Sequence, residues 1–202
     1  MAHIPDGVLS SPVLVAGAVI SLAGVTLGLR GLDPVRAPRV AVLSAVLFVA
    51  SLVHFPAGLA SVHLLLNGLA GIVLGWAVFP AMLIALLLQA VLFGFGGLVV
   101  LGVNTMDMAV PAVLAGLLFR GLWRSGTSRR AAIAGGIAGG GAVLLTVVMV
   151  AGVLAASGRE FTVAAKLVVM THIPVMVVEA VFTAAAISLL ARVKPEMLTR
   201  PV

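Results

Sequence analysis

Long apolar runs separated by short polar connections constrain the fold of this chain more than any other feature. Of the 202 residues, 62% are hydrophobic and only 9% are charged, whereas soluble domains are about half apolar and about a quarter charged. The mean hydropathy is +1.30. No water-soluble fold could bury so much apolar surface, so the runs predict membrane-spanning helices.

Seven such runs are long enough to cross a bilayer, since each spanning helix needs roughly 20 apolar residues. The predicted spans are 12–30, 39–54, 62–79, 80–95, 105–123, 131–157 and 166–191. We expect a single integral membrane domain over residues 1–202, with 1–11 before the bundle of 12–191 and 192–202 after it. Phe79 and Pro80 predict a tight hairpin turn between the third and fourth spans. The predicted fold class is therefore an all-α, polytopic membrane helix bundle.

The basic residues are distributed unequally between the two sides of this predicted bundle. Ten of the 12 lie on one side, namely Arg30, Arg36, Arg39, Arg120, Arg124, Arg129, Arg130, Arg192, Lys194 and Arg200. Under the positive-inside rule this side is cytoplasmic, which places the N-terminus outside and the C-terminus in the cytoplasm of a multi-pass protein of the cell inner (plasma) membrane. The basic residues form small groups rather than one stripe, so no nucleic-acid partner is expected.

Small residues recur within the spans and predict close helix contacts. Gly24 and Gly28 lie four residues apart, and five glycines fall between positions 135 and 141. Such residues let helix backbones approach each other. Packing within the bundle is the favoured interpretation, and docking of a partner membrane subunit is the alternative.

The predicted outer end gathers the polar residues that are most able to bind a ligand. They are His3, Asp6, His54, His63, Asn104, Asp107 and His172, and they include all four histidines. Several imidazoles at one membrane face suit nickel, cobalt, copper or zinc, and without cysteine no thiolate can take part. For His54 and His172, a hydrogen-bonded interfacial histidine is the alternative interpretation.

His3 has a sharper meaning because it lies next to a free amine. An amine, a backbone amide nitrogen and an imidazole from the first three residues form fused chelate rings around a divalent ion. Planar nitrogen ligation favours nickel or copper, and its affinity should rise with pH because the ligands must lose protons. Pro5 and Gly7 would let residues 1–4 fold back into the bundle. An unstructured tail is the alternative.

Five stretches carry a family resemblance. In order and spacing, HIPDGVLSSP, VHFPAG, SVHLLLNGLAGIVLG, QAVLFGFGGLVVLGVNTMDMA and HIPVMVVEAVFTA resemble the CbiM/NikM family. Its members are the metal-binding membrane subunits of energy-coupling-factor cobalt and nickel importers. The resemblance implies a seven-span protein that captures cobalt for cobalamin synthesis or nickel for nickel enzymes, with the ion as transported substrate and no bound organic cofactor.

The resemblance also implies a ligand set. The N-terminal amine, the amide and imidazole of His3, and the imidazole of His63 would hold the ion. Asn104 matches an asparagine of the family's loop before the fifth span, and His172 and Glu179 match its last-helix motif. Together with Asp6, His54 and Asp107, these residues are candidates to orient the ligands or to line the entrance path.

Three departures from the family pattern bear on this site. The family begins Met-His, whereas Ala2 intervenes here, so removal of Met1 would restore His3 to the second position. If Met1 stays, the amine, two amides and His3 could fill four planar positions and leave His63 axial or unused. In the second departure, residues 59–62 replace glycines before the third span, and Phe95 stands where the family usually has an aspartate. In the third, His54 stands where the family often has an asparagine.

Glu179 is the only carboxylate deep within a predicted span. Such a residue is costly unless it is protonated, paired or facing a polar cavity. We expect a buried hydrogen-bond node there, and direct participation in transport is the alternative.

Energy for transport would have to come from other proteins, since the chain has no Walker A sequence. It is expected to be no enzyme. The resemblance implies a transmembrane coupling subunit, two ATP-hydrolysing subunits and often a small accessory membrane subunit. Candidate docking residues are Arg120, Arg124, Arg129 and Arg130, with a purely topological role as the alternative.

Three other functions fit the residues less well. An intramembrane metalloprotease would need a zinc motif such as H-E-x-x-H, but His63 is followed by three leucines. A haem-binding electron-transfer subunit would need histidines facing each other at matched depth, for which His54 and His172 are candidates. A channel or carrier for small organic solutes would explain the spans but not the one-sided histidines.

Overall fold

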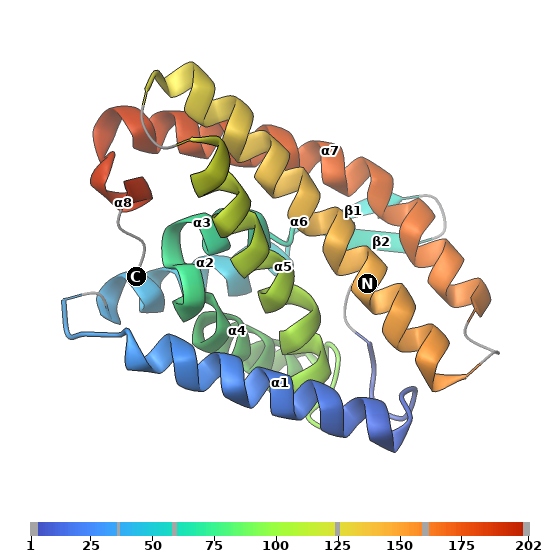
Figure 1. Ribbon diagram of the computed structural model, residues 1–202. Coiled ribbons are helices and arrows are strands. Elements are labelled where there is room, and N and C mark those ends of the chain that lie inside the picture. The colour runs from blue at the N-terminus through green and yellow to red at the C-terminus, as the bar shows by residue number, and fades with distance from the viewer. Residues whose placement is uncertain (1–3, 36, 58–59, 124–125, 159–161, 200–202) are drawn as a thin grey trace.

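The computed structural model describes residues 4–35, 37–57, 60–123, 126–158 and 162–199 as a helical bundle (Figure 1). Its helices are α1 (Ser11–Arg30), α2 (Ala37–Ser51), α3 (Asn67–Leu74), α4 (Val78–Phe93), α5 (Leu101–Leu122), α6 (Ser128–Ser157), α7 (Thr162–Val193) and α8 (Glu196–Thr199). A 3-10 turn, η1 (Gly75–Ala77), joins α3 to α4. The strands β1 (His54–Ala57) and β2 (Ala60–His63) interrupt the otherwise helical fold.

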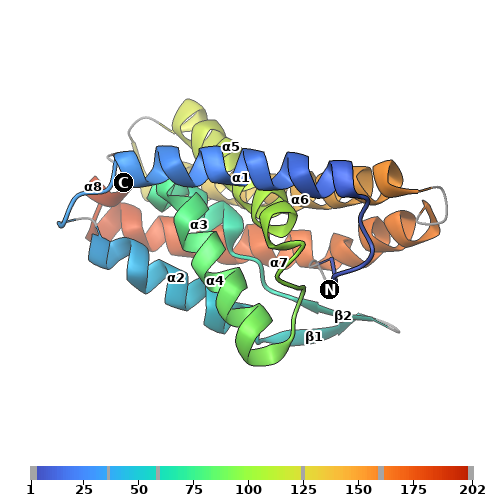
Figure 2. The same ribbon diagram turned by 90° about the horizontal axis from the view of Figure 1, so that it is seen from below.

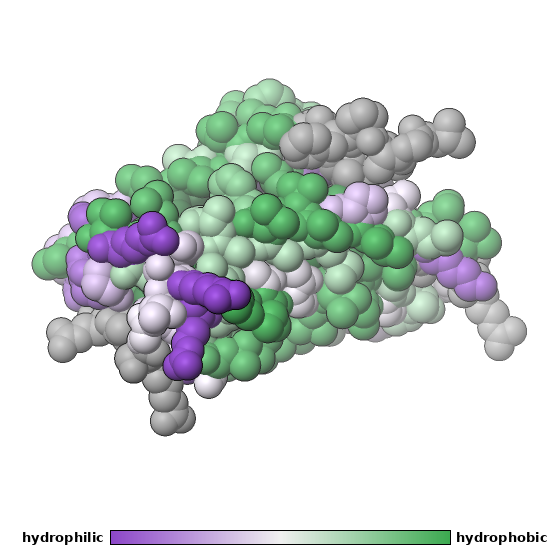
Figure 3. Space-filling view, turned by 90° about the horizontal axis from the view of Figure 1, so that it is seen from above, coloured by the Kyte–Doolittle hydropathy of each residue, from purple (hydrophilic) through white to green (hydrophobic). Residues whose placement is uncertain are grey.

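The helices have the length and composition of membrane spans. Five stretches qualify, namely Ser11–Arg30, Asn67–Phe93, Leu101–Leu122, Ser128–Ser157 and Lys166–Val193, and the apolar helix Ala37–Ser51 is shorter. Hydrophobic residues cover most of the face in Figure 3, and hydrophilic groups gather toward its two ends. The predicted multi-pass helical membrane protein is thereby confirmed.

The turn predicted at Phe79 and Pro80 is misplaced. Both residues lie in the first turn of α4, where the missing N–H of proline costs no helical hydrogen bond. The break falls at Gly75, whose φ of +57° lies in the left-handed region. Glycine adopts that region without steric cost, so the chain reverses at the glycine and not at the proline.

Packing on α5 shows that α3 and α4 run in opposite directions. Going along α3, Asn67 bonds to the Met108 carbonyl and Gly71 abuts Ala112, so α3 runs parallel to α5. The start of α4 lies against the end of α1, where Gly28 meets Pro80. The end of α4 leads through residues 94–100 into the start of α5. The two short helices thus form a hairpin, as the sequence predicted, with its turn at η1.

The connection between α2 and α3 is a β-hairpin, which the predicted span boundaries at 54 and 62 missed. The antiparallel register pairs His54 with His63 and Phe55 with Val62. Phe55 and Val62 are of the aromatic and β-branched types that favour strands, and they pair in this register. Leu66 then has a φ of +49°, so the backbone turns sharply before α3.

Glycines bring the helices together inside the molecule. Any side chain at Gly24 would collide with Phe79, at Gly135 with Ile187, and at Gly139 with Thr183. The first contact joins α1 to α4, and the other two join α6 to α7. Packing within the bundle, the favoured interpretation of these glycines, therefore accounts for them.

Candidate metal-binding site

A two-bond clamp anchors the N-terminal segment inside the bundle. The backbone N–H of Ile4 donates to Oδ1 of Asn104 at 3.0 Å, and Nδ2 of Asn104 donates to the Ile4 carbonyl at 3.0 Å. Both residues are only 3% exposed. Because one primary amide satisfies both backbone groups of Ile4, the chain is held there in position and direction.

The residues after Ile4 continue across the ends of two helices. The Val100 N–H, at the start of α5, donates to Oδ1 of Asp6 at 3.0 Å, and Gly97 abuts that carboxylate so closely that any side chain there would displace it. The N–H of Ser10 donates to Oγ of Ser157 at the end of α6 at 3.3 Å. In both ribbon views the segment turns back from the start of α1 into the bundle (Figures 1 and 2).

The fold-back predicted for residues 1–4 holds for Ile4, the one of them that the structure describes, and an unstructured tail is wrong for residues 4–10. Met1, Ala2 and His3 lie outside the described residues. The predicted chelate of these three residues stays a prediction.

His63 ends β2 in a buried position. Its side chain is 3% exposed, and Nδ1 lies 3.0 Å from the Leu64 carbonyl oxygen. A carbonyl can only accept, so Nδ1 is the donor in this contact and carries the hydrogen of the neutral ring. His54 stands opposite His63 in the strand register, and its side chain is outside the described structure.

Glu179 holds the turn that follows His63. Its Oε1 accepts from the N–H groups of Leu65 and Leu66, the latter at 2.8 Å, and its side chain is fully buried. These bonds join α7 to the turn in which Leu66 is left-handed. The prediction that Glu179 is a buried residue held by hydrogen bonds is thus confirmed.

Asn67 is a polar residue of this region that the sequence interpretation did not single out. Its Nδ2 donates to Oγ1 of Thr146 at 2.8 Å and lies 3.4 Å from the Met108 carbonyl, so it joins α3, α5 and α6. An asparagine four residues after His63 inside an apolar run was the available signal. Asn104, which binds Ile4, and Met108, whose carbonyl binds Asn67, lie one turn apart on α5. Ile4 and Asn67 therefore contact successive turns of that helix.

His172 and Asp107 complete the set of inward-facing polar residues. His172 is 2% exposed, and its Nδ1 lies 2.8 Å from the Val168 carbonyl on its own helix. It shares a face of α7 with Glu179, two turns away. Asp107 is 1% exposed, and neither carboxylate oxygen has a hydrogen-bond partner among the described residues.

The described polar residues do not make up a complete ligand set for a metal ion. Within the ranges that the structure describes, no group of three or more histidine, cysteine, aspartate or glutamate side chains could hold a metal ion. The predicted chelate depends on His3 and the terminal amine for its other ligands. His63 is the described residue best prepared to join them.

The predicted docking arginines lie at the opposite end of the bundle. Arg120 is half-buried in the last turn of α5, and Arg129 and Arg130 are exposed in the first turn of α6. Arg124 is outside the described residues. Since α6 has Ser157 at its other end, the N-terminal segment and these arginines are separated by the length of that helix.

Known proteins resemble the chain over almost its whole length. It is 43% identical to a putative metal transport protein of Haemophilus influenzae, covering 98% of this chain and 97% of that protein. It is 32% identical to the fused nickel transport protein NikMN of Rhodobacter capsulatus, covering 97% of this chain but 63% of that longer protein.

A solved structure and a family profile agree with these relatives. The crystal structure of a truncated transition metal transporter matches with a TM-score of 0.69 and 25% identity, covering 93% of this chain and 97% of that one. Residues 3–197 match the profile described as the CbiM cobalt uptake substrate-specific transmembrane region. The chain therefore belongs to the CbiM family of membrane proteins of cobalt uptake.

Proposed function

We propose that this chain captures a cobalt or nickel ion at the outer face of the membrane, as the substrate-binding subunit of an ATP-driven importer. The terminal amine of Met1 or Ala2, the amide and imidazole of His3, and the imidazole of His63 hold the ion. The clamp between Ile4 and Asn104 carries this proposal. It anchors, inside the bundle, the residue that directly follows His3.

A buried ligand must be oriented before the ion arrives, and His63 meets this requirement. The Leu64 carbonyl fixes the orientation of the imidazole through Nδ1, and Glu179 accepts hydrogen bonds from the backbone N–H groups of Leu65 and Leu66. Ordering a ligand in advance lowers the entropy lost on binding. Glu179 therefore acts as a positioning residue for His63.

The remaining polar residues adjust the environment of the ion. Asp107 supplies a buried negative charge that offsets part of the charge of a divalent cation, which is otherwise costly away from water. His172 orients a neighbouring ligand, and Asp6 fixes the N-terminal segment against α5. His54, opposite His63 in the hairpin, lies on the entrance path.

Other subunits supply the energy. A transmembrane coupling subunit and two ATP-hydrolysing subunits assemble with the chain, with Arg120, Arg124, Arg129 and Arg130 as docking residues on the cytoplasmic side. A small accessory membrane subunit joins them. The fused relative supports this last partner, because it is longer than the present chain and its name combines two components.

Metal content and titration calorimetry test the proposal on three proteins, each with nickel and with cobalt. Protein with the native terminus should bind one ion. An N-terminal extension blocks the amine, and His63→Ala removes an imidazole, so each should weaken binding by at least tenfold. Undiminished binding of both metals by the extended protein would contradict the proposed site.

A further inference from the structure

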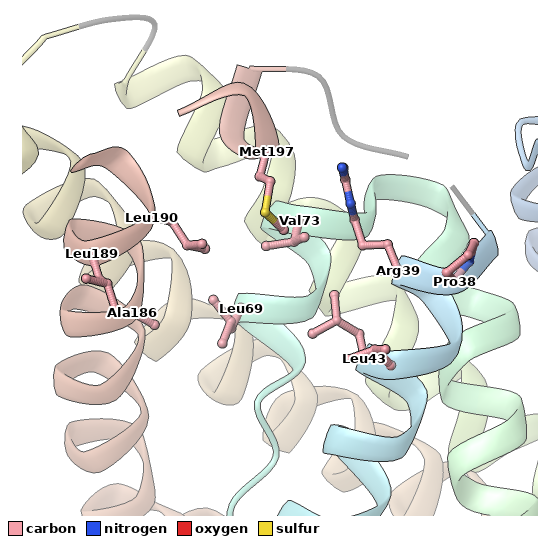
Figure 4. Close-up of a pocket in the computed structure, with 10 residues that line it drawn as sticks. Pro38, Arg39, Leu43, Leu69, Val73, Ala186, Leu189, Leu190 and Met197 are labelled. Atoms are coloured by element: carbon pink, nitrogen blue, oxygen red, sulfur yellow. The ribbon is translucent and has the colours of Figure 1, made fainter. Parts of the chain in front are cut away.

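A long apolar groove separates α2 from α7. Two cavities of about 510 and 540 Å³ share Val42 and lie end to end along α2. Leu43 and Val46 line the groove from α2, Ala186 and Phe182 line it from α7, and residues of α3 and the turn before it form the floor. Figure 4 shows the cavity of about 510 Å³, with Leu189 and Leu190 on one side, Leu43 on the other and Leu69 between them.

The groove carries one charged residue, and it lies at one end. Arg39 is half-buried in the first turn of α2, and its guanidinium points away from the apolar lining in Figure 4. The other residues that line the two cavities are uncharged. A cavity between α1, α4 and α5 is equally apolar but has no charged residue in its lining.

The dimensions of the groove match one leaflet of a bilayer. Arg39 and Val49, both at the groove, are ten residues apart on α2, a rise of about 15 Å. Half of the hydrocarbon core of a bilayer also measures about 15 Å. A molecule whose anionic head lies at Arg39 would therefore have its hydrocarbon chains along the remaining apolar lining.

The groove is less suited to a partner's helix. Tight helix contacts in this protein use glycines, as at Gly24, Gly71 and Gly139, and small residues serve this purpose in membrane helices generally. The groove is lined chiefly by leucine and valine, whose branched side chains leave an uneven surface. Flexible acyl chains adapt to such a surface more readily than a rigid helix does.

We propose that this groove binds an anionic phospholipid, with its phosphate on Arg39 and an acyl chain between α2 and α7. The lipid joins α2 to the rest of the bundle on the side where the described helices leave it open. Its chain reaches toward Leu64 and Leu66, which line the far end of the groove, and so supports the turn after His63.

Lipid retention tests this proposal on the full-length protein. The protein is exchanged into detergent with phosphatidylglycerol or phosphatidylcholine, and the retained lipid is counted by native mass spectrometry. The wild type should retain phosphatidylglycerol in preference. Arg39→Gln should weaken its binding about fivefold, as expected for one arginine at an anionic headgroup. Ala186→Trp, which fills the groove, should abolish retention of both lipids.

Two variants serve as matched controls. Arg30→Gln removes an exposed arginine in the last turn of α1, outside the groove. Ala185→Trp adds an indole at the exposed neighbour of Ala186. Both should retain lipid as the wild type does, and helical circular dichroism checks that every variant is folded. Equal retention of the two lipids by the wild type, or equal effects of Arg39→Gln and Arg30→Gln, would overturn the proposal. Unchanged lipid retention in Ala186→Trp would also overturn the proposal. If that variant in addition lost a membrane partner, the groove would bind a partner's helix and not a lipid.

Discussion

Asn104 shows how one side chain can organise the site. A primary amide has both a donor and an acceptor, and here they satisfy the N–H and the carbonyl of Ile4. The side chain thus makes the two hydrogen bonds that a neighbouring β-strand would make to Ile4, where the N-terminal segment enters the bundle. Asp6 adds a second fixed point on the start of α5.

Replacing Asn104 should release this segment. Asn104→Leu leaves the N–H and carbonyl of Ile4 buried without partners, at about 1–3 kcal/mol for each group, and we expect nickel affinity to fall by at least tenfold. Asn104→Asp keeps the acceptor for the Ile4 N–H and loses the donor, so its loss should be similar or smaller. Titration calorimetry measures both. Wild-type affinity in Asn104→Leu would show that the clamp has no part in binding.

A pair of substitutions at Glu179 separates hydrogen bonding from charge. Glu179→Gln keeps an oxygen that can accept from Leu65 and Leu66, whereas Glu179→Leu leaves both N–H groups unpaired. We expect the leucine variant to lose about 2–6 kcal/mol of stability from these two groups and the glutamine variant to stay near the wild type. Thermal unfolding and metal affinity are the measurements, with the lipid-facing Val177→Leu as control. If glutamine is as harmful as leucine, the charge of Glu179 is what matters.

At the scale of elements, α3 and α4 depend on close backbone contact. Gly71 of α3 lies against the Ala112 backbone of α5, and Gly116 of α5 lies against the Gly71 backbone. This reciprocal contact brings Asn67 within reach of α5 and α6. The short α3 therefore owes its position to small residues.

Two glycine substitutions test this contact against a neutral site. Gly71→Ala should destabilise the protein, since its methyl group collides with the Ala112 backbone and neither helix can give way cheaply. Gly152→Ala in α6 meets nothing within 4 Å, so it should be neutral or stabilising by about 0.5–1 kcal/mol through helix propensity. Thermal unfolding in detergent compares the two. Equal melting temperatures would contradict the importance of the α3–α5 contact.

For the whole molecule, the two ends of the bundle carry different groups of residues. The N-terminal segment, His63 and the polar residues of α5 and α7 gather toward one end, whereas α8 and most described basic residues lie toward the other (Figure 1). This separation matches the predicted orientation, in which ions are captured outside and the energy-supplying partners bind inside.

Cysteine labelling can determine that orientation, because the chain has no cysteine of its own. Val163→Cys lies at the exposed start of α7, and Pro195→Cys lies in the exposed turn before α8. A membrane-impermeant maleimide should label the first in intact cells and the second only after permeabilisation. Neither substitution changes a basic residue, so the charge distribution stays intact. The reverse labelling pattern would refute an outer N-terminus.

The helical membrane fold was predictable from the sequence, and so were the buried node at Glu179 and the inward course of the N-terminal segment. Each follows from local chemistry, because hydropathy over 20 residues or a lone carboxylate in an apolar run needs no knowledge of neighbours. The turn at Gly75, the β-hairpin and the role of Asn67 could not be predicted in the same way. The proline at position 80 gave a stronger local signal than the glycine at position 75, and an asparagine in an apolar run does not reveal its partners.

The sequence by itself determined that the chain lies in a membrane, which family it resembles and which residue types are available for metal binding. Only the tertiary structure decided which of them are brought together: that Asn104 holds Ile4, that Glu179 holds the turn after His63, and that Asp107 is buried without a hydrogen-bond partner among the described residues. The physical reason is sequence separation. The contacts of Asn104 and Glu179 join residues about a hundred positions apart. Their geometry depends on how α3, α5 and α7 pack, which no local pattern of hydropathy or charge encodes.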